Sequence, residues 1–152
     1  MKKVFKNERA PNVPIDVISY TKKMISQNPY VTVHVGTDSQ NHRRHTFFVV
    51  CVCYRYGNRG VHVIYHKIKE KKIKDKYTRL WKETELTMEV AMHISNNNLK
   101  VDWVDFDLND DDAYFSNKLV SSSLGWARGY GYKCNVKPET LVACRAADHL
   151  CR

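Results

Sequence analysis

Apolar and polar residues alternate in one stretch near the start of the chain, residues 30–40, YVTVHVGTDSQ. Valines occupy every second position from Val31 to Val35. A period of two in a β-branched run predicts a strand with one buried face. Gly36 ends this run, and Asp38 follows it. An acid at the end of a buried strand is costly unless a cation meets it, so Asp38 is a candidate metal ligand, with an ordinary turn aspartate as the alternative.

The remaining hydrophobic pattern predicts an α/β domain. Strands are expected over residues 30–36, 46–56, 61–69, 99–106 and 132–136, and helices over residues 15–27, 76–96, 112–128 and 139–151. Gly57–Gly60 predicts a hairpin turn between the second and third strands. Residues 1–14 include Pro11 and Pro14 and are expected to form an extended arm, so that residues 15–152 make up a single domain.

Two acids are predicted to lie on the apolar faces of helices. Successive helical residues are rotated by about 100°, which puts Glu83 in the middle of the apolar stripe of its helix. Glu85 and Glu89 fall on the opposite side of that helix. Asp148 shares a stripe with apolar residues of the last helix. Carboxylates are rarely buried without a partner, so both are candidate ligands, with a salt-bridged glutamate and a surface aspartate as the alternatives.

The predicted topology brings the candidate acids together. The first and fourth strands can be parallel neighbours, joined by a right-handed crossover through the Glu83 helix. Asp38 and Asp105 then lie side by side at one edge of the sheet, where open α/β sheets bind their ligands. Asp107 competes with Asp105, because both lie on one face of the fourth strand. Gathered carboxylates repel one another, and divalent cations with a preference for oxygen ligands, Mg²⁺ or Mn²⁺, remove that repulsion.

The net charge of the chain indicates a class of binding partner. The chain has 152 residues and a formal net charge of +9, which favours a polyanion such as nucleic acid. The basic residues concentrate in two segments, and we expect nucleic-acid contacts from His42, Arg43, Arg44, His45, Lys71, Lys72, Lys74 and Lys76. No apolar run is long enough to span a membrane, and the basic N-terminus lacks the apolar region of a signal peptide. The five cysteines are expected to be reduced, which favours the cytoplasm.

The topology and the four acids resemble the ribonuclease H-like superfamily. The segments GTDSQ and KETELTMEV, at residues 36–40 and 82–90, resemble in particular the YkuK family of predicted ribonuclease H-like nucleases. The resemblance implies a five-stranded mixed sheet of order 3-2-1-4-5, with strand 2 antiparallel. Helices flank this sheet, and the helix over residues 15–27 is an N-terminal addition.

The resemblance also implies an activity, the hydrolysis of phosphodiester bonds with two Mg²⁺ or Mn²⁺ ions. Asp38 would bridge both ions, Glu83 and Asp105 would hold the ion on the leaving-group side, and Asp148 would complete the site of the other ion. RNA, an RNA–DNA hybrid or structured DNA would be the substrate. A catalytically weak or inactive module that binds nucleic acid on the same fold is the alternative.

Overall fold

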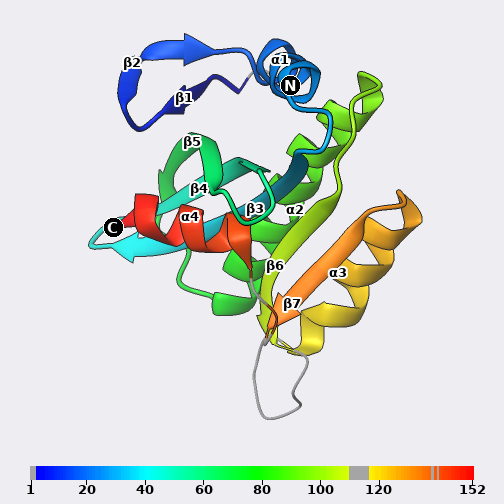
Figure 1. The fold of residues 1–152 in the computed structure, drawn as a ribbon. Coiled ribbons are helices and arrows are strands. Elements are labelled where there is room, and N and C mark those ends of the chain that lie inside the picture. The colour runs from blue at the N-terminus through cyan, green and yellow to red at the C-terminus, as the bar shows by residue number, and fades with distance from the viewer. Residues whose placement is uncertain (1–2, 110–116, 138, 140) are drawn as a thin grey trace.

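The computed structural model describes residues 3–109, 117–137, 139 and 141–152, and these residues form a mixed sheet with helices on both faces (Figure 1). The strands of the described residues are β1 Phe5–Asn7, β2 Ala10–Ile15, β3 Thr32–His42, β4 His45–Arg55, β5 Val61–Lys71, β6 Trp103–Asn109 and β7 Lys133–Lys137. The helices are α1 Val17–Gln27, α2 Lys76–Asn96, α3 Asn117–Gly129 and α4 Val142–Cys151.

The sheet has seven strands in the order β2-β1-β5-β4-β3-β6-β7. Its inner part, β5-β4-β3-β6-β7, has the predicted order, with β4 antiparallel to both neighbours and β3, β6 and β7 parallel. The expectation of five strands was wrong, because residues from the predicted N-terminal arm form β1 and β2 at the β5 edge. Pro11 and Pro14 lie in β2, the outermost strand, where a missing backbone N–H leaves no ladder bond unmade.

Local sequence accounts for the start and end of the helices. The helix predicted over residues 76–96 is α2, and the carboxylate of Asp75 caps it by accepting a hydrogen bond from the Thr78 backbone N–H at 2.9 Å. Asp16 caps α1 in the same way. The start of the helix predicted from residue 112 lies outside the described residues, and α3 is described from Asn117. The last helix begins at Val142, later than predicted.

The two faces of the sheet carry two separate cores. Helix α2 packs on one face together with α1 and α3, above the buried Val33 and Val35 of β3 and Val31 just before it. Helix α4 lies alone on the other face and covers a smaller core made of Val49, Cys51, Cys53, Ala143, Ala147 and Cys151 (Figure 1). All five cysteines are free thiols, as expected. Within the described residues, no helix combines the length and apolarity that a membrane crossing requires.

Gly36 allows α4 to approach the sheet closely. A Cβ atom at this position would lie 2.9 Å from the Ala143 Cβ and 3.1 Å from the backbone N of Cys144. Only a residue without a side chain fits this contact. The glycine at the end of the first predicted strand therefore serves helix packing, and it brings α4 beside the next residues of β3.

Candidate metal centre

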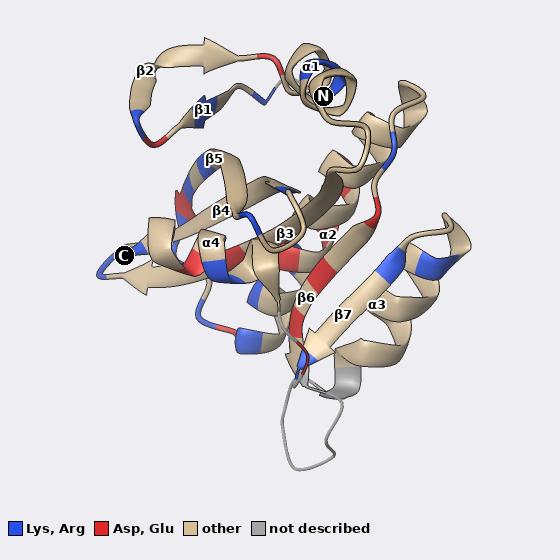
Figure 2. Cartoon of the chain, viewed as in Figure 1, with Lys and Arg blue, Asp and Glu red and all other residues tan. Residues whose placement is uncertain are grey.

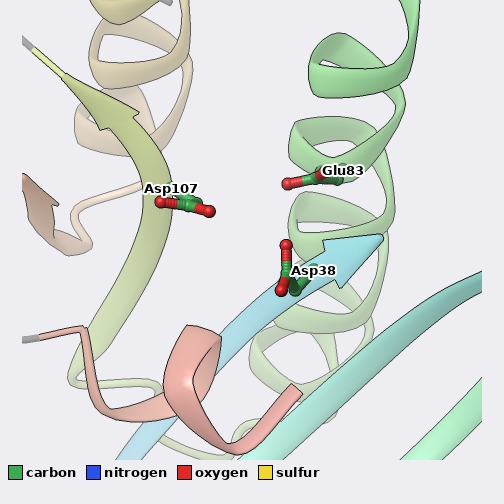
Figure 3. A group of neighbouring side chains, drawn as sticks. All are labelled: Asp38, Glu83 and Asp107. Atoms are coloured by element: carbon green, nitrogen blue, oxygen red, sulfur yellow. The ribbon is translucent and has the colours of Figure 1, made fainter. Parts of the chain in front are cut away.

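Three carboxylates from distant parts of the sequence meet beside the middle of β3. This strand does not end at Gly36, as predicted, but continues to His42 in its ladder with β4. Asp38, Glu83 and Asp107 each offer one ligand atom, and these atoms all lie within 4.8 Å of one another. Asp38 comes from β3, Glu83 from α2 and Asp107 from β6, and Figure 3 shows their side chains around a common space. The structure thus brings together the predicted residues Asp38 and Glu83, and it adds Asp107.

Helix α2 holds Glu83 against the sheet. Glu83 is buried, with 6% of its surface exposed, as its place in the apolar stripe predicts, and Glu85 and Glu89 are exposed. Its Oε2 accepts a hydrogen bond of 2.5 Å from the hydroxyl of Ser39, the residue after Asp38. One turn further along α2, the Thr87 hydroxyl donates to the Thr37 hydroxyl at 2.9 Å. These bonds fix α2 to the middle of β3 at the level of the acids.

The register between β3 and β6 decides which aspartate joins Asp38. Gly36 pairs with Asp105 in this parallel ladder, so Asp107 lies at the level of Asp38, two residues further along each strand. The sequence places Asp105 and Asp107 on one face of the strand, but it does not give the register. Among the described residues, the group of neighbouring acids contains Asp107 and not Asp105.

Asp105 has other partners. Its side chain is fully buried, and its two oxygens accept hydrogen bonds from the Asn135 side chain at 3.0 Å and from the Ala143 backbone N–H at 2.8 Å. The first turn of α4 has no side-chain cap of its own, so the Asp105 carboxylate satisfies one of its free N–H groups. Burial raises the pKa of Asp105 to about 6 despite these two bonds. The contacts of Asp105 anchor the start of α4.

Asp148 lies beside the acidic group but is not part of it. Its side chain is 51% exposed and forms an ion pair of 2.9 Å with Arg152, one turn further along α4. Asp148 and Asp38 nevertheless line the same open cleft, whose volume is about 420 Å³. Asp107, Lys137 and Cys144 also line this cleft.

A lysine that the sequence analysis did not single out lies against the acids. The Nζ atom of Lys137 is 2.6 Å from Oδ1 of Asp107, and this contact raises the pKa of the lysine. Lys137 ends β7, the parallel neighbour of β6. Its position at the carboxyl end of a parallel strand could have predicted a place in the site, because ligands of such sheets bind there.

Burial and the repulsion of neighbouring carboxylates raise the pKa values of Asp38 and Glu83. The pKa of Asp38 is raised to about 7, mainly because the carboxyl is buried and further because Asp107 and Asp148 are close. The pKa of Glu83 is raised well above its ordinary range, first by burial and then by Asp38 and Asp107. A divalent cation would relieve this repulsion, and three carboxylates suit a hard cation. The residues therefore fit Mg²⁺ or Mn²⁺.

The family model described as ribonuclease H-like matches residues 13–152. The chain belongs to the ribonuclease H-like family. No curated protein matches the sequence. The closer resemblance to the YkuK family stays a prediction.

The two basic segments of this ribonuclease H-like chain, residues 42–45 and 71–76, lie beside each other. Arg43 and Arg44 make the turn between β3 and β4, whose end residues His42 and His45 pair with each other. The loop after β5 is held against this turn, since the Lys72 N–H donates to the carbonyl of Arg44 at 3.1 Å. Figure 2 shows basic residues around this end of the sheet, near the C-terminal end of α4. The two basic segments of the sequence are thus neighbours in space.

Proposed function

We propose that this ribonuclease H-like chain is a metal-dependent nuclease that hydrolyses phosphodiester bonds of nucleic acid. One observation carries the proposal, the meeting of Asp38, Glu83 and Asp107 within 4.8 Å beside an open cleft. Bound Mg²⁺ or Mn²⁺, two ions in this proposal, would supply an activated water and stabilise the leaving oxygen. We propose Asp107 in place of Asp105 as the ligand from β6, because Asp107 is the aspartate of β6 that lies in the acidic group, whereas the Asp105 carboxylate bonds the first turn of α4.

Each residue of the centre has a separate task in this proposal. Asp38 lines the cleft and would hold both cations. Glu83, fixed by the hydroxyl of Ser39, would hold its carboxylate in place while substrate enters. Asp148 would approach from α4 once Arg152 releases it. Lys137 would exchange its contact with Asp107 for a substrate phosphate, because its side chain is half exposed.

The substrate would be RNA, an RNA–DNA hybrid or structured DNA. A net charge of +9 on a chain that gathers acids at its cleft leaves the positive charge on the surrounding surface. The residues that we propose for backbone contacts are His42, Arg43, Arg44, His45, Lys71, Lys72, Lys74 and Lys76. Such contacts position the substrate without reading its sequence. Reduced cysteines favour the cytoplasm as the location.

A second candidate function is an inactive module that binds nucleic acid on the same fold. Two ion pairs favour it, since Arg152 holds Asp148 and Lys137 already neutralises part of the charge on Asp107. In this case nucleic-acid binding would depend on salt and would not require a divalent cation.

Cleavage assays separate the two functions. The wild-type chain should cut at least one member of a panel containing single-stranded RNA, an RNA–DNA hybrid and branched DNA, with millimolar Mn²⁺ or Mg²⁺ and not with EDTA. Asp38→Asn should reduce the rate at least about 100-fold, because the cations supply several kcal/mol of transition-state stabilisation. Glu85→Gln, on the exposed side of the same helix as Glu83, should keep wild-type activity. Equal cleavage by wild type and Asp38→Asn would reject the proposed nuclease.

A further inference from the structure

The ladders of the β3–β4–β5 meander align a row of side chains with Asp38. Asp38 pairs with Val49, and Val49 pairs with Lys67. The next level on the same face carries Gln40, Phe47 and Lys69, and the level after that carries His42, His45 and Lys71. Side chains two residues apart on a strand share a face, so these levels lie on one side of the sheet.

That side is the face on which α4 and the cleft lie. Cys51 and Cys53 belong to the core beneath α4, and Val49 and Phe47 continue their side of β4. The Sγ atom of Cys151 contacts the carbonyl of Asp38 at 3.5 Å, which places the last turn of α4 at the level of this aspartate. The Phe47 level is therefore the next one along the sheet after the level of Asp38 and α4.

Phe47 is partly exposed among cationic and imidazole side chains. The Nζ atom of Lys67 lies 4.9 Å from the centre of its ring, and the ring of His42 packs edge-on at 5.2 Å between centroids. Lys67 and Lys69 are exposed, and so is Gln40. An aromatic ring in contact with Lys67 and His42, on a surface in line with Asp38, combines a stacking platform with phosphate contacts.

We propose that this surface, made of Gln40, His42, His45, Phe47, Lys67, Lys69 and Lys71, binds a single-stranded segment of nucleic acid next to the scissile phosphate. A base stacks on Phe47, and Lys67 moves from the ring to a backbone phosphate. The place of the segment beside a scissile phosphate rests on the proposed nuclease function, whereas the binding itself does not.

The chemistry of the surface selects this occupant. The lysines attract a polyanion, and the described surface residues of these three levels include no acid beyond Asp38 itself. A base inside a duplex has both faces covered by its neighbours, so away from duplex ends the Phe47 ring can stack only on an unpaired base. The substrate is therefore expected to be single-stranded where it leaves the metal centre.

Binding measured without cleavage tests the surface. Fluorescence anisotropy would follow the full-length Asp38→Asn chain in EDTA with labelled oligo-dT, oligo-rU and a blunt DNA duplex of the same length. Phe47→Ala in this background should weaken binding of the better single strand about tenfold and binding of the duplex by less than twofold. Phe47→Trp should keep single-strand binding. The DNA and RNA arms identify the sugar that the surface prefers.

Two matched variants control for folding and for unspecific charge. Tyr30→Ala removes an aromatic side chain that is 91% exposed before β3, at the strand end remote from Asp38, and should leave binding unchanged. Lys69→Ala should lower the slope of log binding constant against log salt concentration for the single strand by about 0.7. Lys23→Ala, which changes an exposed residue of α1, should leave this slope unchanged.

The outcomes separate this inference from the nuclease proposal. Unchanged single-strand binding in Phe47→Ala, or an equal loss for the duplex, overturns the surface whatever the enzymatic activity. Selective loss of single-strand binding in a chain that cleaves nothing would keep the surface and reject only the nuclease.

Discussion

At the residue scale, Asp38 has a strongly perturbed carboxyl group in the acidic centre. Burial raises its pKa to about 7, and the nearby Asp107 and Asp148 act in the same direction, while the backbone N–H of Ser39 opposes them. An ordinary aspartate in an unfolded chain titrates near 4. The folded protein without metal therefore holds a proton at Asp38 that the unfolded chain releases over the range between about pH 4 and pH 7.

This difference predicts a pH dependence of stability. Because the folded state binds more protons in this range, the free energy of unfolding of the metal-free chain should fall as the pH rises from about 4 to about 7. Asp38→Asn removes one such group, so the variant should lose less stability over the same range. Thermal unfolding in EDTA from about pH 4 to about pH 7 measures the effect, with Glu85→Gln as a control that follows the wild type. A steeper loss in Asp38→Asn than in the wild type would contradict the raised pKa.

At the scale of elements, the contact between β3 and α4 shapes the cleft. Gly36 lets the first turn of α4 lie on the strand, and the Asp105 carboxylate accepts from the Ala143 N–H in that turn. Asp148, which follows on α4, lines the cleft with Asp38. The distance between the two elements therefore controls the width of the cleft as well as the packing of the core.

Gly36→Ala should separate these elements. The new methyl group would meet Ala143 Cβ and the Cys144 backbone, neither of which is a flexible side-chain end. The free energy of unfolding should decrease by about 1–3 kcal/mol, as expected for an overpacked core. Urea unfolding measures this loss. Gly125→Ala is the matched control, since nothing lies within 4 Å of its added Cβ in α3, and the change should be neutral or stabilising. Equal effects of the two substitutions would show that the close contact between Gly36 and α4 does not contribute to stability.

At the scale of the whole molecule, the acidic group connects elements that are far apart in the chain. β3, α2 and β6 each contribute one carboxylate, so a bound cation would connect α2 to two neighbouring strands of the sheet. An unfolded chain does not bring these residues together, and cation binding should therefore stabilise the fold by mass action.

Mn²⁺ at 100 times its dissociation constant should add about 2.7 kcal/mol to the stability. For a domain of this size the melting temperature should rise by roughly 5–10 °C. Asp107→Asn should abolish most of this rise, whereas Asp105→Asn should keep it, because the amide oxygen can still accept from the Ala143 N–H. Differential scanning calorimetry with Mn²⁺ and with EDTA measures both. The reverse result would restore Asp105 as the ligand from β6.

Features that depend on residues close together in the chain could be predicted from the sequence. The spacing of valines gives β3, and the helical spacing gives α2 with Glu83 inward and Glu85 outward, because both patterns depend on neighbours a few residues apart. The order of the inner strands follows from the crossover rule. β2 was missed because an edge strand with prolines and exposed side chains has no apolar face to mark it, and β1 was missed because three residues are too few to show a period of two.

The sequence by itself therefore determined the inner sheet, its main helix and the buried position of Glu83, since short-range periodicity records which face of an element is covered. Only the tertiary structure decided that Asp107 rather than Asp105 stands beside Asp38, that Lys137 contacts the acids and that Phe47 continues the row toward the basic turn. These facts depend on the register between strands and on the seating of α4. Register is set by contacts between residues that are dozens of positions apart, and no local pattern records it.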